Sequence, residues 1–221
     1  MHPSLDAIRL VAFDLDGTLI DSVPDLAAAL DATLEAHDLA PAGEARVRDW
    51  VGNGSRKLVE RALAFALGRD PDASALDAAL EDFLGRYAEA PCRRTRVYSG
   101  VKEALEALAE RDLILCVITN KPQAFIAPIL ATLGLDRYFD ATLGGDSLSE
   151  KKPHPMPLWH LATHFDVAPS SCLMVGDSRH DIEAGRRAGF RTLAVPYGYN
   201  HGEPVAASAP DGLVESLGEL V

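Results

Sequence analysis

The stretch from Ile8 to Ser22 reads IRLVAFDLDGTLIDS and holds the strongest structural signal in the chain. Its first part, Ile8 to Phe13, is a short run of mainly apolar and β-branched residues, which is typical of a buried strand. Two carboxylates, Asp14 and Asp16, follow this run at once. The stretch therefore predicts a buried strand that ends in a pair of acidic side chains.

Two other runs have the same character, Leu113 to Ile118 and Cys172 to Val175, and polar residues follow each of them. Helical patterns lie between the runs, for instance Val101 to Arg111. Alternating strands and helices predict an α/β fold with a doubly wound parallel sheet. Because parallel strands end at the same edge, where open α/β folds bind ligands, we expect the polar endings to converge on one site.

A different texture marks the segment between the first strand and the second. Alanine- and leucine-rich helical patterns such as Asp25 to His37 and Lys57 to Leu67 fill it, without a strand-like run. The sequence therefore predicts a core domain of residues 1–19 and 93–221, with a small α-helical domain of residues 20–92 inserted into it.

The composition limits the classes of partner. Forty-eight per cent of the 221 residues are hydrophobic and the formal charge is −12, which describes a soluble globular protein that lacks the basic stripe needed to bind nucleic acid. The chain shows neither a leader pattern nor an apolar run of about 20 residues, which excludes a membrane partner and predicts a cytoplasmic protein. Both a monomer and a homodimer are compatible with the sequence.

Asp14 is placed to attack the phosphorus of a small phosphate monoester and to form an aspartyl phosphate, a known form of covalent catalysis. Its charge repels a phosphate dianion, so a cation between the two is needed. Mg²⁺ prefers carboxylate and carbonyl oxygens, which Asp14, the Asp16 carbonyl and Asp177 could supply. The sequence thus predicts Mg²⁺ as the cofactor.

Other polar residues complete the predicted chemistry. Lys152 and Thr119 can bind phosphoryl oxygens as charge shifts during the reaction. Asp16 is suited to protonate the leaving alkoxide and then to deprotonate the attacking water, and Gly17 permits the tight turn that this position requires. The N-terminus of the helix after Gly54 attracts anions, so that Arg56 or Lys57 could meet a substrate carboxylate.

Four segments of the chain together resemble the motifs of the haloacid dehalogenase-like phosphatases: DLDGTLIDS at 14–22, ITNK at 118–121, KPHP at 152–155 and GDSRHD at 176–181. The resemblance implies a Rossmann-like core, a helical cap, Asp14 as nucleophile and Asp16 as acid and base. It also implies phosphate contacts from Thr119 and Lys152, and Mg²⁺ held by Asp14, Asp16 and Asp177, with Asp181 as a ligand or as an outer-sphere partner.

Within that family, VGNGS at 51–55 and PYGYN at 196–200 are similar to bacterial phosphoglycolate phosphatases. This resemblance implies hydrolysis of 2-phosphoglycolate to glycolate and phosphate. The residues predicted to bind the substrate are Gly17, Thr18, Asn53, Arg56, Lys57 and Asn120.

Three alternatives remain at this point. The first is a phosphatase or mutase of the same family that acts on a sugar phosphate, for example an amino-sugar 6-phosphate. The others are a phosphoacceptor signalling module and a binding protein that has lost turnover. Asp16, placed to speed dephosphorylation, and the inserted helical segment, which could exclude water, favour an enzyme.

Overall fold

A computed structural model describes residues 3–221, and its centre is a six-stranded parallel sheet in the order β5-β4-β1-β6-β7-β8. The strands are β1 (Leu10–Phe13), β4 (Ile114–Ile118), β5 (Ala141–Leu143), β6 (Cys172–Gly176), β7 (Arg191–Ala194) and β8 (Gly212–Leu213). The three strands expected from the sequence are β1, β4 and β6, which lie side by side within the sheet. The predicted α/β fold with a parallel sheet is confirmed.

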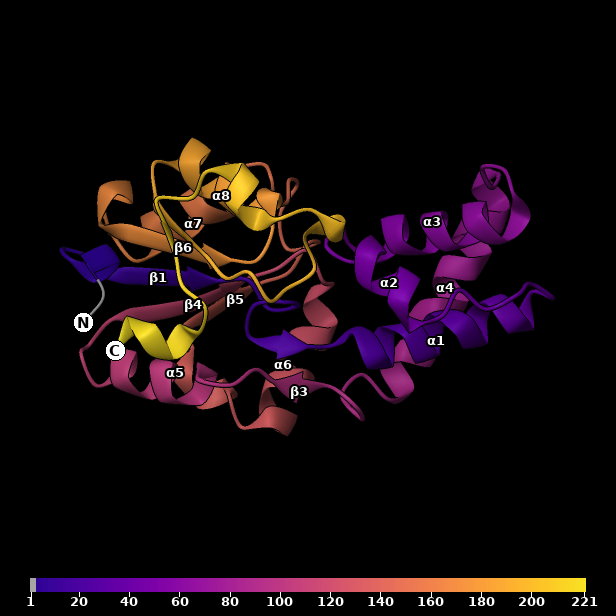
Figure 1. The fold of residues 1–221 in the computed structure, drawn as a ribbon, viewed down its shortest axis with the longest axis horizontal. Coiled ribbons are helices and arrows are strands. Elements are labelled where there is room, and N and C mark those ends of the chain that lie inside the picture. Colours follow the sequence, from indigo (N-terminus) through magenta and orange to yellow (C-terminus); the bar gives the residue numbers. More distant parts are fainter. Residues whose placement is uncertain (1–2) are drawn as a thin grey trace.

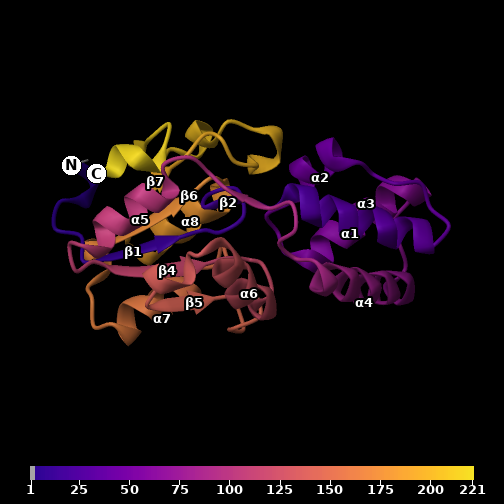
Figure 2. The same cartoon turned by 90° about the horizontal axis from the view of Figure 1, so that it is seen from below.

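Helices cover both faces of the sheet (Figures 1 and 2). They are α5 (Val101–Ala109), α6 (Gln123–Leu133), α7 (Met156–His164) and α8 (Arg179–Ala188). Successive residues of a strand point to opposite faces, and β1 follows this rule. Val11 and Phe13 belong to the apolar core that includes α5 and α6, whereas Leu10 and Ala12 belong to the core that includes α7 and α8.

A second group of helices lies apart from the sheet, beyond the carboxyl ends of its strands (Figure 1). We call it the helical lobe, and it consists of α1 (Val23–Ala36), α2 (Glu44–Trp50), α3 (Ser55–Leu67) and α4 (Ala73–Glu89). The chain enters and leaves the lobe through an antiparallel strand pair, β2 (Ile20–Asp21) and β3 (Arg96–Val97). This pair brings the two crossings of the chain side by side.

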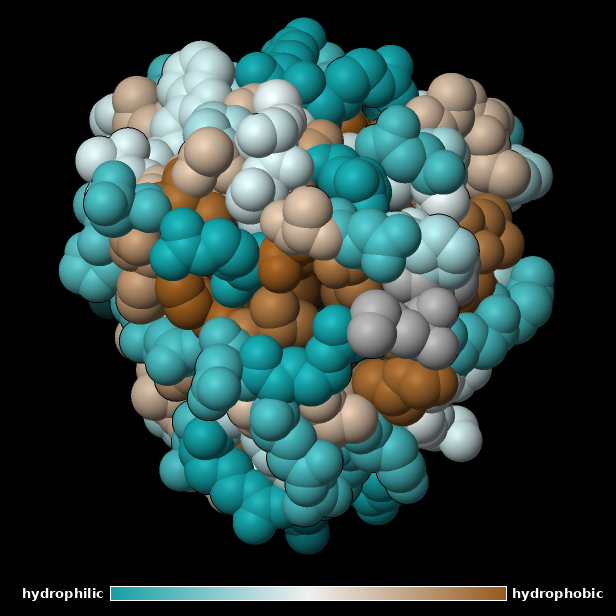
Figure 3. All heavy atoms as spheres, turned by 90° about the vertical axis from the view of Figure 1, so that its left-hand side faces the viewer, coloured by the Kyte–Doolittle hydropathy of each residue, from teal (hydrophilic) through white to brown (hydrophobic). Residues whose placement is uncertain are grey.

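Short 3₁₀ helices complete the described chain: η1 (Pro3–Leu5), η2 (Asp136–Tyr138), η3 (Pro169–Ser171), η4 (Asn200–Gly202), η5 (Val205–Ser208) and η6 (Leu217–Leu220). No helix within residues 3–221 is long and apolar enough to cross a membrane. The end of the core opposite the lobe shows mainly hydrophilic side chains around a small apolar hollow (Figure 3). The polar strand endings lie at the other end, facing the lobe.

Candidate active site

The carboxyl ends of β1 and β6 bring acidic residues together. Phe13 pairs with Val175 in the parallel register, so that Asp14 and Asp177 follow neighbouring strand ends. Asp181 joins them from the first turn of α8, and one oxygen of each carboxylate lies within 4.8 Å of the others. All three residues are buried. The structure therefore gathers three predicted site residues at one point.

Lys152 supplies the positive charge at this point. Its side chain is 2% exposed, and its Nζ atom lies 2.9 Å from Asp14 Oδ1 and 2.6 Å from Asp181 Oδ1. We call Asp14, Lys152, Asp177 and Asp181 the aspartate–lysine cluster. Its lysine bridges the carboxylate after β1 and the carboxylate on α8, which fixes all three groups relative to the sheet.

Hydrogen bonds also occupy carboxylate oxygens of Asp177 and Asp181. Asp177 accepts from the Thr18 hydroxyl at 2.8 Å and from the Tyr199 backbone N–H at 2.7 Å. Asp181 Oδ2 accepts from the Ser178 hydroxyl and backbone N–H, forming a capping box at the start of α8. Asp181 thus serves both the helix and Lys152.

Two glycines make room for Asp177. Gly17 has φ of +92°, which an L side chain rarely adopts, and a Cβ atom there would overlap the Asp177 carboxylate. A Cβ atom at Gly198 would overlap the same side chain. The predicted turn at Gly17 therefore has a second purpose, because it lets the backbone approach the acidic cluster closely.

The electrostatics of the cluster fit a bound cation. Burial raises the pKa of the Asp14 carboxyl to about 7, although the charge of Lys152 opposes this shift. Burial and the charges of Asp181 and Asp14 raise the pKa of Asp177 well above its usual range. A divalent cation would relieve this crowding of buried negative charge, and carboxylate oxygens are the donors that a hard cation prefers.

The Asp16 carboxylate does not face this cluster. Its two oxygens lie 2.9 and 3.0 Å from Lys121 Nζ, and the Ser22 hydroxyl donates to it at 2.5 Å. Burial acts against the charge of Lys121, but the charges and hydrogen bonds of Asp16 and Tyr87 together outweigh it and raise the pKa of the ammonium group. In this arrangement Asp16 can serve a metal only through its backbone carbonyl, the atom expected from the sequence.

Thr119 and Asn120 follow β4 beside the cluster, and both are buried. The Thr119 hydroxyl accepts from the Lys121 backbone N–H at 3.2 Å. The Asn120 side-chain amide donates to two carbonyls, that of Lys152 at 3.0 Å and that of Gly52 at 2.9 Å. Asn120 therefore joins the core to the helical lobe, a structural contact in addition to its predicted place at the substrate.

Several contacts connect the lobe to the core around the segment Asp49 to Gly54. Asn53 Nδ2 lies 2.9 Å from His180 Nε2, and His201 Nδ1 lies 2.9 Å from the Asp49 carbonyl oxygen. Lys151 Nζ donates to the Asn53 carbonyl at 3.1 Å. We call these bonds, with that from Asn120 to Gly52, the lobe contact. The predicted substrate residue Asn53 thus lies at the boundary between lobe and core.

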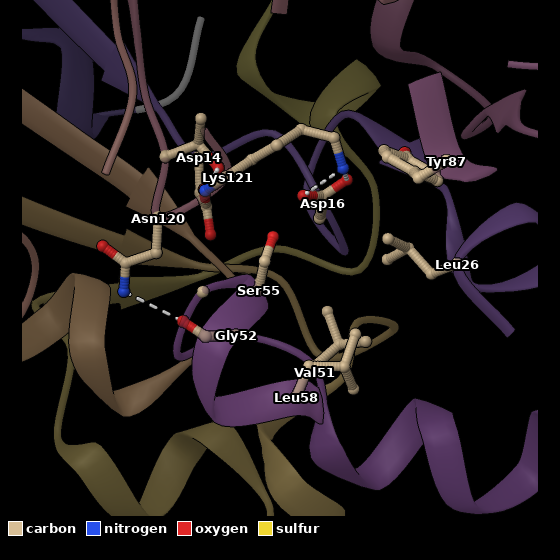
Figure 4. Close-up of a pocket in the computed structure, with 12 residues that line it drawn as sticks. Asp14, Asp16, Leu26, Val51, Gly52, Ser55, Leu58, Tyr87, Asn120 and Lys121 are labelled. Carbon is tan, nitrogen blue, oxygen red and sulfur yellow. Dashed lines mark hydrogen bonds and ion pairs between the residues drawn. The ribbon is translucent and has the colours of Figure 1, made fainter. Parts of the chain in front are cut away.

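A cavity of about 40 Å³ lies between the strand ends and the helical lobe (Figure 4). Its core lining is Asp14, Asp16, Thr119, Asn120 and Lys121, and its lobe lining is Leu26, Val51, Gly52, Gly54, Ser55, Leu58 and Tyr87. A cavity needs roughly 10 to 15 Å³ to hold one water molecule, so this space suits only a small group of atoms.

Of the six residues predicted to bind the substrate, Asn120 lines the cavity, whereas Gly17, Thr18, Asn53, Arg56 and Lys57 do not. Arg56 forms an ion pair with Asp77 at 2.6 Å, and Lys57 forms one with Glu60 at 2.8 Å, both with about half of the basic side chain exposed. The helix start lies near the cavity, as expected, but through Gly54 and Ser55. The next two side chains project away because successive residues of a helix point in different directions.

Three residues at this site were not among the predicted ones. Lys121 belongs to the ITNK segment, but nothing in that segment alone indicated that its side chain would meet Asp16. His180 lies inside the GDSRHD segment and contacts the lobe. Tyr87 lies in the middle of α4, where an aromatic residue at helical spacing is indistinguishable from an ordinary core residue.

The chain is similar to known proteins of one family. A family model described as haloacid dehalogenase-like hydrolase matches residues 11–195. A phosphoglycolate phosphatase of Pectobacterium atrosepticum is 45% identical over 217 residues, which cover 98% of this chain and 92% of that protein. One of Nitrosococcus oceani is 42% identical over 212 residues, which cover 96% of this chain and 94% of that protein.

Solved structures agree. The crystal structure of a predicted phosphoglycolate phosphatase from Haemophilus somnus matches with a TM-score of 0.93 at 39% identity, covering 97% of this chain and 96% of that one. The match includes the helical lobe as well as the sheet, since almost the whole of each chain is covered.

Proposed function

The chain belongs to the haloacid dehalogenase-like hydrolases, and from this we propose that it hydrolyses 2-phosphoglycolate to glycolate and phosphate. It is a phosphoric monoester hydrolase, as its relatives are. The observation that carries the assignment to the site is the contact of Asp14, which lines a small cavity, with Lys152 behind it at 2.9 Å. This pair provides a nucleophile beside a fixed positive charge.

The reaction has two steps. An Asp14 carboxylate oxygen attacks phosphorus, the bond to the ester oxygen breaks, and Asp16 gives its proton to the leaving glycolate alkoxide. A water molecule then attacks the aspartyl phosphate, Asp16 takes its proton, and the bond between Asp14 and phosphorus breaks to release phosphate. Lys152, held by Asp14 and Asp181, stabilises the negative charge on the phosphoryl oxygens.

We assign the metal site to Asp14 and Asp177 together with the backbone carbonyl of Asp16, and the metal to Mg²⁺. The crowded, buried carboxylates support this choice. When bound, the cation would offset the repulsion between Asp14 and the phosphate dianion. Asp181 acts through Lys152 in this proposal, because its Oδ1 atom forms an ion pair with Lys152 Nζ at 2.6 Å, which Asp177 does not.

The helical lobe acts as a cap that determines the leaving group. Its residues supply the apolar side of the cavity, through Leu26, Val51 and Leu58 (Figure 4). Closing the lobe over the cluster excludes bulk water from a reactive acyl phosphate. The small volume of the cavity favours a leaving group of a few atoms over a sugar, which supports 2-phosphoglycolate over the sugar phosphate alternative.

Release of inorganic phosphate tests the proposal. The substrates are 2-phosphoglycolate, several sugar phosphates including an amino-sugar 6-phosphate, nucleotides and phosphoamino acids, each with Mg²⁺. We expect the highest kcat/KM with 2-phosphoglycolate and a loss of at least about a thousandfold in the Asp14→Asn variant or after EDTA. A better sugar phosphate substrate would refute the assignment of 2-phosphoglycolate and leave the phosphatase chemistry in place.

A further inference from the structure

We propose that Lys121, with the Tyr87 hydroxyl, binds the carboxylate of the substrate and so determines the choice of leaving group. This inference rests on the proposed function, because it names the residues that would recognise the glycolate part of 2-phosphoglycolate. It moves that role from the predicted lobe residues Arg56 and Lys57 to a lysine of the core.

The cavity contains little positive charge. Among its lining residues in the described chain, Lys121 is the only basic one, and the acidic ones are Asp14 and Asp16. Lys152 lies in the aspartate–lysine cluster, where it serves the phosphate. An anionic leaving group in this cavity therefore needs Lys121, since burial of a carboxylate without a cationic partner is strongly unfavourable.

The position of Lys121 fits the geometry of the substrate. Its Nζ atom lies 2.9 and 3.0 Å from the two oxygens of Asp16 (Figure 4). In the proposed reaction Asp16 exchanges a proton with the ester oxygen, and a single methylene separates that oxygen from the substrate carboxylate. A group that contacts Asp16 is thus within reach of the carboxylate when the ester oxygen is within reach of Asp16.

Tyr87 provides a second, independent observation. Tyr87 is 2% exposed, and its hydroxyl proton has no acceptor within residues 3–221, because the neighbouring Lys121 ammonium can only donate to the hydroxyl oxygen. A buried hydroxyl proton without an acceptor is unfavourable. Because Tyr87 lines the same cavity, a carboxylate oxygen there can accept the missing hydrogen bond.

The tyrosine and the lysine lie together. Lys121 Nζ is 4.9 Å from the centre of the Tyr87 ring, a cation–π distance. Tyr87 comes from α4 of the lobe and Lys121 from the segment after β4 of the core. The two donors therefore lie beside each other only when the lobe is placed over the core, and the recognition of a carboxylate depends on that closure.

Two substrates of equal length separate this role from a purely structural one. They are 2-phosphoglycolate and 2-hydroxyethyl phosphate, in which a hydroxymethyl group replaces the carboxylate. The measured quantity is the ratio of kcat/KM for the two esters. The variants are Lys121→Met, Lys121→Arg and Tyr87→Phe, and the control is Lys102→Met, which removes one charge from an exposed position on α5.

We expect Lys121→Met to lower the ratio at least about 30-fold, as loss of a buried charge partner does. Tyr87→Phe keeps the ring and is expected to lower the ratio about fivefold. Lys121→Arg should retain much of the ratio because it keeps the charge, and Lys102→Met should leave it unchanged. Thermal unfolding of each variant establishes that it is folded.

Each contrary result has one meaning. If Lys121→Met slows both esters by the same factor, Lys121 only positions Asp16, and the inference is wrong while the proposed function stands. If the wild-type protein shows no preference for 2-phosphoglycolate over 2-hydroxyethyl phosphate, the proposed function fails at the level of the substrate, and the inference fails with it.

Discussion

The aspartate–lysine cluster is buried and the lobe contact is part-buried to exposed, and the two polar regions differ in how their polar atoms are paired. In the cluster, Lys152 bridges Asp14 and Asp181, and Asp177 accepts two hydrogen bonds. Around the lobe contact and the cavity, several buried atoms have no partner among the described residues: Asn53 Oδ1, Asn120 Oδ1, His180 Nδ1, His201 Nε2 and Tyr87 Oη.

This difference corresponds to two kinds of task. Fixed charges stabilise a transition state best when their orientation is complete before the substrate arrives. Atoms without partners at a boundary have the opposite property, because ligand or water can satisfy them when the lobe moves or the substrate binds. We therefore infer that the cluster serves the proposed chemistry and that the lobe contact permits opening and recognition.

Substitutions of two adjacent lysines in the β5–α7 loop, Lys151 and Lys152, test this difference most directly. Lys152→Met removes the partner of two buried carboxylates. We expect the free energy of unfolding to fall by about 3 to 5 kcal/mol and the activity to be lost. Lys151→Met removes one exposed hydrogen bond of the lobe contact, and we expect a loss below about 0.5 kcal/mol. Urea denaturation without added Mg²⁺ measures both.

If the two variants lose equal free energy of unfolding, the proposed difference between the aspartate–lysine cluster and the lobe contact is wrong. Added Mg²⁺ sharpens the test, since a cation can replace part of the charge that Lys152→Met removes. We expect Mg²⁺ to restore more stability to this variant than to Lys151→Met, by binding the uncompensated carboxylates.

The cluster is the part of the site that the sequence predicts well. Asp14 and Asp177 follow apolar runs that form neighbouring parallel strands, so their meeting follows from the topology of the sheet alone. Lys152 was predicted as a phosphate contact and Asp181 was implied by the family resemblance, and the structure places both beside Asp14. Short-range signals suffice for the three aspartates because each is fixed by a strand end or a helix cap, whereas Lys152 lies in the loop between β5 and α7.

The lobe side is harder to predict because helical periodicity does not settle which side chain of a helix start faces a neighbouring domain. Arg56 and Lys57 were natural candidates for an anionic substrate, yet each has an acidic partner on the lobe itself. Lys121 and Tyr87 meet only through the packing of α4 against the core. No local pattern contains that contact, which joins residues far apart in the sequence.

His201 gives the lobe contact a pH dependence. Burial lowers its pKa, opposed by the hydrogen bond to Asp49, and the facing Arg61 and Arg179 lower it further. His180, packed against it, also has a lowered pKa. Below about pH 6.5 the unfolded chain therefore binds a proton at His201 that the folded protein does not, and the free energy of unfolding falls as the pH falls.

The His201→Gln variant isolates this contribution, since His180 remains in both proteins. We expect the wild-type protein to lose stability relative to His201→Gln when the pH is lowered from 7.5 to 5.5, as measured by urea denaturation. The change is bounded by about 1.4 kcal/mol per pH unit for one proton, and partial exposure of the ring keeps it smaller. A difference that does not change with pH would show that His201 is solvated in the folded protein.

The smallest effects on kcat/KM are expected from substitutions of Arg56 and Lys57. These variants test whether basic residues of the lobe contribute to substrate binding. Both side chains are about half exposed and paired with acids on the lobe surface, where an ion pair contributes at most about 1 kcal/mol. We expect Arg56→Met and Lys57→Met each to change kcat/KM for 2-phosphoglycolate less than about twofold. A loss of tenfold or more, confined to 2-phosphoglycolate and absent with 2-hydroxyethyl phosphate, would mean that the start of α3 turns its basic residues inward when substrate binds. In that case the anion would be recognised by the lobe, and Lys121 would lose its place as the cation of the cavity.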